Sequence, residues 1–216
     1  MTTRPADRYH HGDLREALLA AGEAALAERG VEGFTLRECA RRAGVSHAAP
    51  AHHFGDVAGF LAELAAVGFD RLTAAMEERR GGAGPAPLAQ LHAIGRGYIT
   101  FAVRNRALFQ IMFRHDGIGA GSPSLQRAGA TAFGVLQAAM ARVIAAHRPA
   151  QAPLPSLALA WSAVHGFATL LIERQLDACL GQDGIQDLEA DLGAAMLTLM
   201  TDALSGPPTI PVGGES

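Results

Sequence analysis

Residues 35–54 read TLRECARRAGVSHAAPAHHF and predict two short helices that meet at a tight turn. Thr35 can cap the first helix, and Glu38 follows three residues later, as a capping box requires. Gly44 can take the left-handed conformation that ends a helix, and Ser46 can cap the next helix. Two short helices joined by a glycine-containing corner form the helix-turn-helix pattern.

The second helix of this pair, expected over about residues 47–53, has the position of a reading helix in the DNA major groove. An ordinary helical hairpin within a soluble bundle is the alternative interpretation of the same residues. The composition of the whole chain favours helices, because the chain is rich in alanine and only 6% aromatic. It is therefore compatible with both the DNA-binding motif and the helical hairpin.

Motifs in both halves of the chain resemble TetR-type transcriptional regulators. Ala43-Gly44-Val45-Ser46 followed by His53-Phe54 resembles the helix-turn-helix motif of that family. YHHGDLR at residues 9–15 resembles the entry to the first helix in one branch of the family. WSAVHG at residues 161–166 resembles the Trp-x-x-x-His-Gly signature of the regulatory domain in the same branch.

The resemblance implies an all-α fold in which a three-helix helix-turn-helix head precedes a larger helical regulatory domain. Apolar spacing and Gly/Pro breakers give about nine helices in total. Beyond the two helices of the motif, we expect them over residues 13–29, 56–78, 88–103, 105–114, 124–147, 156–180 and 185–204.

The breaker GGAGPAP at residues 81–87 suggests where the chain divides. We expect residues 1–55 to form the DNA-binding domain, with helix four at about 56–80 as the connection. Residues 81–205 would form the ligand-binding and dimerisation domain, and residues 206–216 a flexible tail.

Charge and composition constrain the function further. The 216 residues carry a net charge of −3, but residues 36–54 hold three arginines against one glutamate. The sequence contains no lysine, so every fixed positive side chain is arginine, which binds phosphate and guanine in a bidentate manner. Cys39 and Cys179 are far apart and read as small buried side chains in a reducing compartment.

The sequence shows neither a secretory signal nor an unbroken apolar run of the roughly eighteen residues that a membrane span needs. We therefore expect a cytoplasmic protein without membrane contact.

The resemblance assigns roles within the head. Thr35 and Ser46 would face phosphates, where the helix N-termini add partial positive charge. The short side chains of the reading helix would allow close approach to base edges, and its histidines could donate hydrogen bonds. The candidate DNA-binding residues are Thr35, Arg37, Arg42, Ser46, His47, Ala48, Ala49, His52 and His53.

Two positions depart from the family pattern. Ala51 stands where most relatives have tyrosine, and Val57 stands where most have lysine. Both residue types usually contact the DNA backbone, so their loss predicts weak or strongly salt-dependent affinity. Pro50 is also unusual, because it lies near the limit of the first turn, where a missing amide is harmless.

An apolar pocket is expected in the helical domain, with a few polar groups on its wall. Trp161 and His165 are four residues apart and share one helix face, although core packing around a hydrogen-bonded imidazole explains them equally well. The candidate ligand-binding residues are Phe101, Phe109, Met112, Phe113, Phe133, Trp161 and His165.

The sequence thus predicts a ligand-responsive transcriptional regulator, a repressor that binds a palindromic operator in double-stranded DNA. It would act as a homodimer through its last two helices and be released by a small-molecule effector. The alternative is a helical small-molecule-binding or interaction protein whose head has lost strong DNA binding.

Enzymatic, cofactor and metal sites are not expected. Ser162 and His165 lie three residues apart on a helix, without a Gly-x-Ser-x-Gly turn or an orienting carboxylate. No phosphate-binding loop or other cofactor motif occurs. The adjacent histidines at residues 10–11 and 52–53 would not share a face of a helix, and no Cys-x-x-Cys or His-x-x-x-His pattern accompanies them.

Overall fold

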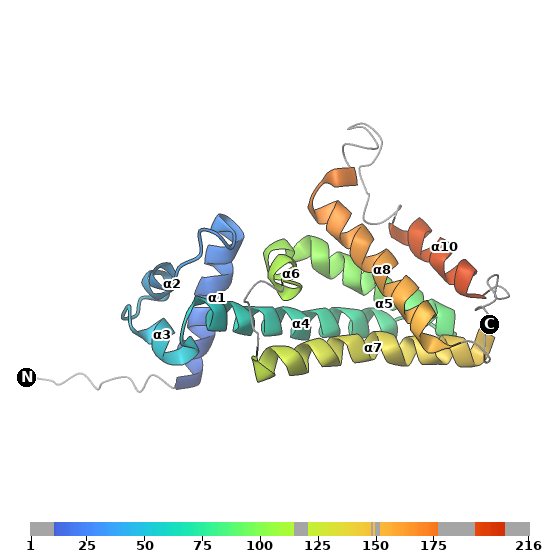
Figure 1. Cartoon of the computed structure of the whole chain (residues 1–216), viewed down its shortest axis with the longest axis horizontal. Coiled ribbons are helices and arrows are strands. Elements are labelled where there is room, and N and C mark those ends of the chain that lie inside the picture. Colours follow the sequence, from blue (N-terminus) through green and yellow to red (C-terminus); the bar gives the residue numbers. More distant parts are fainter. Residues whose placement is uncertain (1–10, 115–120, 148, 150–151, 177–192, 206–216) are drawn as a thin grey trace, which may run out of the picture. The chain divides into compact units, whose positions relative to one another are not determined.

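The computed structural model describes residues 11–114, 121–147, 149, 152–176 and 193–205, and the regular elements within them are helices (Figure 1). These are α1 (His11–Arg29), α2 (Leu36–Ala43), α3 (Ala49–Phe54), α4 (Val57–Gly81), α5 (Pro87–Arg104), α6 (Arg106–Met112), α7 (Pro123–His147), α8 (Pro153–Ile172) and α10 (Gly193–Ser205). The predicted all-helical fold is confirmed. The expected N-terminal arm, the tail at 206–216 and Cys179 lie outside the described residues.

Helix α2 is capped at both ends as the sequence predicts. The Oγ1 atom of Thr35 accepts a hydrogen bond from the Glu38 N–H at 3.3 Å. At the other end Gly44 has a φ of 69°, and its N–H donates to the carbonyl of Arg41. The turn therefore needs glycine at this position, since other residues rarely adopt such a backbone.

Helix α3 begins later than expected. The prediction of Ser46 as its side-chain cap is wrong, because the N-cap is Ala48 and makes no side-chain capping bond. Pro50 explains the shift: it has no N–H, so it is tolerated only within the first turn. A start at residue 47 would put this proline where an amide must donate to a carbonyl one turn earlier.

Helices α4 and α7 are capped by side chains that precede them. Asp56 accepts a hydrogen bond from the Gly59 N–H at 2.8 Å, and Ser122 accepts one from the Leu125 N–H at 3.3 Å. The expected breaker separates α4 from α5, although α4 continues to Gly81 rather than ending near residue 78.

Helix α8 begins earlier and ends sooner than expected. Pro153 occupies its first turn, which extends the start three residues upstream of the predicted residue 156. The helix ends at Ile172, and Arg174 has a left-handed φ of 58°, which interrupts the helical path. Residues 177–180 of this predicted helix and residues 185–192 of the last one lie outside the described part of the chain.

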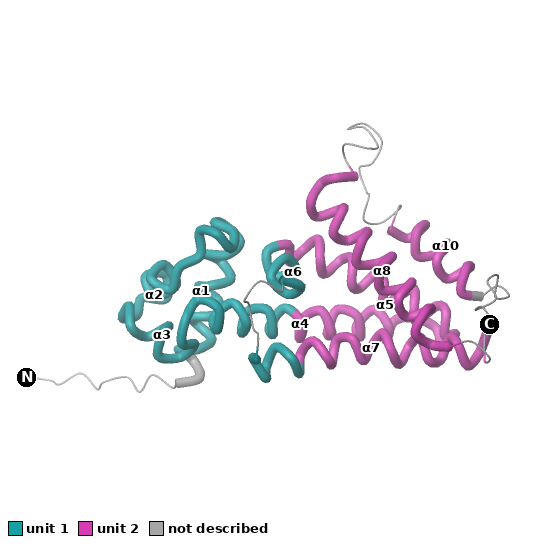
Figure 2. The backbone as a smooth tube through the Cα atoms, in the orientation of Figure 1, with its two compact units in different colours: residues 1–68, 107–127 teal, residues 69–106, 128–216 magenta. Residues whose placement is uncertain are grey.

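Backbone packing divides the chain into two compact units (Figure 2). Unit 1 comprises residues 1–68 and 107–127, and unit 2 comprises residues 69–106 and 128–216. The division falls within α4 and α7, so each of these helices contributes residues to both units. The expected domain boundaries at residues 55, 80 and 205 stay a prediction.

Three phenylalanines form the centre of unit 1. The ring of Phe60 lies 5.4 Å from that of Phe34 and 4.3 Å from that of Phe54, and all three side chains are buried. Such tilted aromatic pairs add specific geometry to simple burial. Because Phe54 ends α3 and Phe60 lies on α4, this cluster fixes the reading helix to the rest of the unit.

Glu63 links three segments of the same unit. Its carboxylate accepts hydrogen bonds from Arg15 of α1 and from Ser124 in the first turn of α7. The guanidinium of Arg15 also lies 5.5 Å from the centre of the Phe54 ring.

Helix α5 is the centre of unit 2 and packs against α8 and α10. Two glycines allow the close approach of its neighbours. A Cβ at Gly95 would lie 2.4 Å from a methyl of Leu197 on α10, and a Cβ at Gly97 would lie 2.6 Å from the carbonyl oxygen of Ala75 on α4. The backbones of α4 and α5 are therefore in direct contact at Gly97.

Helices α7 and α8 each contain an 18-residue window with a mean hydropathy of 1.4, long and apolar enough to cross a membrane. The sequence prediction concerned the length of an apolar run, and polar residues interrupt the runs in both helices without lowering the mean hydropathy below this level. The observation is weak evidence for a span, since core helices of soluble proteins pass the same test.

Candidate nucleic-acid interface

Helix α3 and the turn before it present small and polar side chains to solvent. His47, Ala48, Ala51 and His52 are exposed, whereas Pro50 and Phe54 are buried on the opposite side. The buried pair holds the helix in place, and the exposed side contains no large side chain that would keep DNA at a distance. A short helix with this distribution is suited to close approach to base edges.

The predicted DNA-binding residues differ in accessibility. Six of them are exposed, namely Thr35, Arg37, Ser46, His47, Ala48 and His52. The other three, Arg42, Ala49 and His53, are half-buried. Their individual contacts with DNA stay predictions.

A buried carboxylate organises the basic side of α2. Glu38 accepts hydrogen bonds from Arg41 at 2.7 and 2.9 Å and from Arg42 at 2.8 Å, and Arg29 lies 3.4 Å away. The hydrogen bonds from Arg41, followed by that from Arg42, lower the pKa of Glu38 from 4.5 to about 2. The carboxylate is therefore charged and partnered at neutral pH.

Arg42 bridges two carboxylates within the head. Besides Glu38 it donates to Glu28 of α1 at 2.8 Å, and its side chain is only 18% exposed. Arg37 is exposed and the Arg41 side chain is 64% exposed, so these two arginines are more accessible to a phosphate. Sequence reasoning missed this arrangement, because Glu28 precedes Arg42 by fourteen residues and belongs to another helix.

The two departures from the family pattern are both on the surface. Ala51 is exposed in α3, and Val57, at the start of α4, is 38% exposed. Larger polar side chains at these positions would therefore meet solvent rather than the core.

The predicted ligand-binding residues are divided between the two compact units. Phe109 and Met112 are buried in unit 1, where the Phe109 ring lies 5.1 Å from that of Phe113. Phe101 is buried in unit 2. A shared ligand-contacting role for the full set stays a prediction.

The remaining three, Phe133, Trp161 and His165, do come together in unit 2. The Trp161 ring lies 5.4 Å from that of Phe133 and 6.3 Å from that of His165. Tyr98 of α5 completes the group, because its hydroxyl lies 2.8 Å from His165 Nδ1 and receives a hydrogen bond from Trp161. With the imidazole protonated at Nε2, the tyrosine hydroxyl donates to Nδ1.

This cluster gives the imidazole the hydrogen bond that the core-packing interpretation requires. Burial lowers the pKa of His165 and raises the pKa of Tyr98, so both groups are neutral at pH 7. Tyr98 was missed from the sequence, and only its place on the apolar face of a helix pointed to it.

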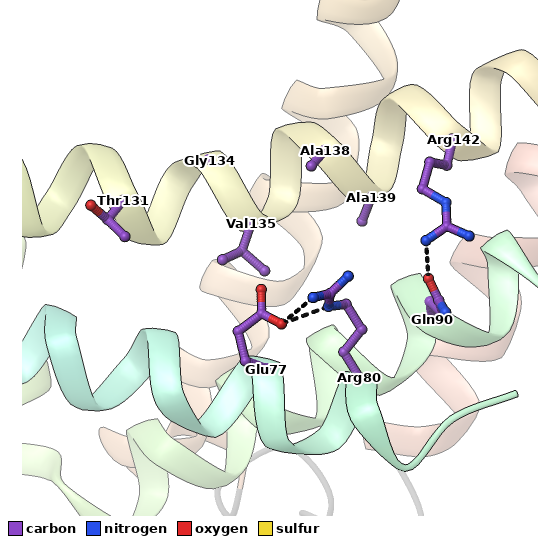
Figure 3. A pocket seen from close by; sticks show the side chains of 9 residues that line it. All are labelled: Glu77, Arg80, Gln90, Thr131, Gly134, Val135, Ala138, Ala139 and Arg142. Carbon is purple, nitrogen blue, oxygen red and sulfur yellow. Dashed lines mark hydrogen bonds and ion pairs between the residues drawn. The ribbon is translucent and has the colours of Figure 1, made fainter. Parts of the chain in front are cut away.

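A second feature that sequence reasoning missed is a pocket of about 290 Å³ in unit 2 (Figure 3). Its polar residues come from α4 and α5 on one side and α7 on the other, and small α7 residues complete the wall. The lining residues are Glu77, Arg80, Gln90, Thr131, Gly134, Val135, Ala138, Ala139 and Arg142. None of the predicted ligand-binding residues is among them.

Cys39 is fully buried in α2, as the sequence predicts for a small apolar side chain. Among the described residues, no group of three or more His, Cys, Asp or Glu side chains is placed to hold a metal ion.

Two protein-family models match this chain. Residues 18–64 match the model of bacterial regulatory proteins of the tetR family, and residues 91–203 match the tetracyclin repressor-like C-terminal domain. The chain belongs to the TetR family of transcriptional regulators. No protein of curated function matches it significantly.

Solved structures agree with the fold of a TetR-family protein. A Rhodococcus sp. protein of unknown function is 32% identical, covers 92% of this chain and 97% of its own, and has a TM-score of 0.74. The TetR-family regulator PfmR from Thermus thermophilus is 20% identical, with 86% and 97% covered and a TM-score of 0.62. The regulator FadR from Bacillus subtilis, solved in complex with stearoyl-CoA, is 13% identical, with 86% and 97% covered and a TM-score of 0.67.

Family membership decides between several sequence predictions. The helix-turn-helix is a DNA-binding one, and the TetR-family chain is a transcriptional regulator rather than an enzyme. Regulators of this family are soluble cytoplasmic proteins, so α7 and α8 are helices of the regulatory domain and not membrane spans.

Proposed function

We propose that this TetR-family regulator is a ligand-responsive repressor that binds a palindromic operator as a homodimer and is released by a small molecule. The observation that carries the proposal is the exposed face of α3, formed by His47, Ala48, Ala51 and His52 within the family's DNA-binding domain. On this account the nine predicted DNA-binding residues act from that face, from the start of α2 and the turn before α3 and, for Arg42 and His53, from the last turns of α2 and α3. The Trp-x-x-x-His-Gly motif supports membership in one branch of the family.

Exposed apolar side chains on the last described helices support the dimer. Leu154 and Leu199 are each 71% exposed, and Leu159 and Leu170 are exposed as well. They lie on α8 and α10, which correspond to the predicted dimerisation surface. A two-fold axis there would present two reading helices to half-sites separated by one helical turn of DNA, roughly 34 Å.

Release by a ligand is a shift between two conformations. A ligand that binds better to the conformation with the wrong separation of reading helices weakens DNA binding, and DNA weakens ligand binding by the same factor. Helix α4 is the candidate lever, because only Gly55 and Asp56 separate it from α3 and it continues without a break to Gly81. Stearoyl-CoA bound by FadR is a precedent for a small-molecule ligand on this fold.

The second candidate function is a helical ligand-binding or interaction protein with a weakened head. Ala51 and Val57 favour it, because both lack the polar group that supports a phosphate contact.

Fluorescence anisotropy with the chain's own upstream DNA, at about 50 and about 150 mM salt, distinguishes the two functions. The regulator binds that duplex saturably, more weakly at the higher salt, and more tightly than a scrambled duplex. Equal, weak binding to both duplexes contradicts the repressor and supports the second function.

A further inference from the structure

The α4–α7 pocket is lined by two guanidinium groups and one carboxylate (Figure 3). The carboxylate is already occupied, because Glu77 accepts a hydrogen bond from Arg80 at 2.7 Å on the same helix. Arg142 on α7 has a different partner. Its Nη1 donates at 2.6 Å to the amide oxygen of Gln90, which is uncharged.

Arg142 therefore brings an uncompensated positive charge to the pocket. Among the described residues, no carboxylate forms an ion pair with it, and only one of its five N–H donors takes part in a hydrogen bond. Together with the neutralised Glu77–Arg80 pair, the lining has a net charge of about +1 by this count. The complementary ligand is an anion that accepts two parallel hydrogen bonds.

The rest of the wall decides what kind of anion fits. Val135, Ala138 and Ala139 give an apolar surface on α7. A hydrated inorganic ion would lose water on contact with this surface without gaining a hydrogen bond. A guanidinium fork matches a planar carboxylate in a bidentate manner. The volume of about 290 Å³ is just below the usual range of small-molecule sites, which favours a small ligand.

We propose that the α4–α7 pocket binds a small organic carboxylate, with Arg142 on its carboxyl group and Val135, Ala138 and Ala139 against its apolar body. Such a ligand also competes with Glu77 for Arg80 and thereby contacts α4, the candidate lever. The contact with α4 gives the chemical class of the effector, and this part of the inference rests on the proposed function.

The test is thermal unfolding of the full chain with three carboxylates and their neutral amides. Benzoate, phenylacetate and hexanoate are compared with benzamide, phenylacetamide and hexanamide, and inorganic phosphate is measured separately at equal ionic strength. At about ten times its Kd, a bound ligand raises the Tm of a chain of this size by about 3 °C or more. We expect at least one carboxylate to give this shift while its amide gives none.

Two variants locate the binding. Arg142→Gln removes the charge, and Ala138→Phe fills the pocket while leaving the charge in place, so each should abolish the shift. Arg96→Gln is the matched control, because Arg96 is an exposed arginine of α5 outside the pocket, and this variant should keep the shift. The inference is overturned if no carboxylate exceeds its amide, if phosphate alone gives the shift, or if the shift persists in Arg142→Gln.

Operator binding, measured by anisotropy on the same samples, separates this inference from the proposed function. A carboxylate that stabilises the chain through Arg142 and lowers its operator affinity supports both. Stabilisation with unchanged operator affinity supports the pocket and contradicts its effector role. Intact operator binding without any stabilisation by carboxylates overturns the pocket alone.

Discussion

Glu38 has two structural roles in the helix-turn-helix, and the sequence indicated only one of them. Its backbone N–H donates to Thr35 at the start of α2, as the capping pattern predicts. Its side chain, however, does not complete the capping box and instead accepts hydrogen bonds from Arg41 and Arg42. The contacts of Glu38 with residues three and four positions along the helix were readable from spacing, but its ion pair with Arg29 of α1 was not.

The first prediction concerns the acid stability of the head. Because the folded pKa of Glu38 is about 2 against an ordinary 4.5, its contribution is present above pH 4.5 and is lost as the pH falls through this window. Glu38→Gln should lower the Tm at pH 7 and flatten the dependence of Tm on pH between about 4.5 and 2. Thermal unfolding followed by circular dichroism measures both, with Glu78→Gln, an exposed carboxylate of α4, as the control. The same pH dependence in Glu38→Gln as in the wild type would refute this role.

The second prediction restores the two missing polar groups. Ala51→Tyr should raise operator affinity about 2- to 10-fold, as one added hydrogen bond of about 0.5–1.5 kcal/mol implies. Val57→Lys should also steepen the logarithmic salt dependence by about 0.9 for each phosphate it contacts. Anisotropy titrations over a range of salt concentrations measure both effects. Val57→Leu is the uncharged control, and a slope no steeper in Val57→Lys than in Val57→Leu would exclude a phosphate contact at this position.

At the scale of elements, the close packing of α4 on α5 depends on one residue without a side chain. A Cβ at Gly97 would lie 2.6 Å from the Ala75 carbonyl oxygen and 2.9 Å from the Met76 Cα, and neither backbone atom can move alone. This contact joins the candidate lever to the central helix of unit 2.

The third prediction is that Gly97→Ala lowers the free energy of unfolding by about 1–3 kcal/mol, because the added methyl overpacks the helix pair. Urea denaturation measures the change. Gly166→Ala is the control on α8, since a Cβ there has no neighbour within 4 Å, and it should be neutral or stabilising by up to about 1 kcal/mol. Equal stability of Gly97→Ala and the wild type would show that α4 and α5 are not in backbone contact.

Element type could be predicted from the sequence far better than element ends or pairings. Helix-forming composition and the breaker at residues 81–87 were sufficient for the order of the described helices. The start of α3 was missed because Pro50 determines it through an absent amide, a constraint that outweighs the capping preference of Ser46.

Features of the candidate sites that depend on neighbouring residues could also be predicted better than those that depend on residues far apart in the sequence. For α3, the family resemblance indicated three of the four exposed side chains, His47, Ala48 and His52. The pocket was not predicted, because Gln90 and Arg142 are fifty-two residues apart in sequence and meet only through the packing of α5 and α7. Tyr98 was missed for the same reason, since its partner His165 is sixty-seven residues away.

At the scale of the whole molecule, α4 and α7 each contribute residues to both compact units. Exposed leucines on α8 and α10 add a surface that a partner copy would cover. A dimer joined there gains affinity for a palindrome because the second head binds at a high effective concentration.

The most direct test of a dimeric operator-binding regulator is an anisotropy titration of its upstream palindrome with the wild type and with Leu199→Glu. The oligomeric state of each protein is measured by analytical ultracentrifugation under the same conditions. Leu199 is highly exposed on α10, and Ala89→Glu, at an exposed position on α5, is the control. We predict that wild type and Ala89→Glu bind as two protomers per duplex. Monomeric Leu199→Glu should bind the palindrome about 100-fold more weakly and a single half-site equally well. A Leu199→Glu protein that stays dimeric, or that binds the palindrome as tightly as the wild type, would contradict the account.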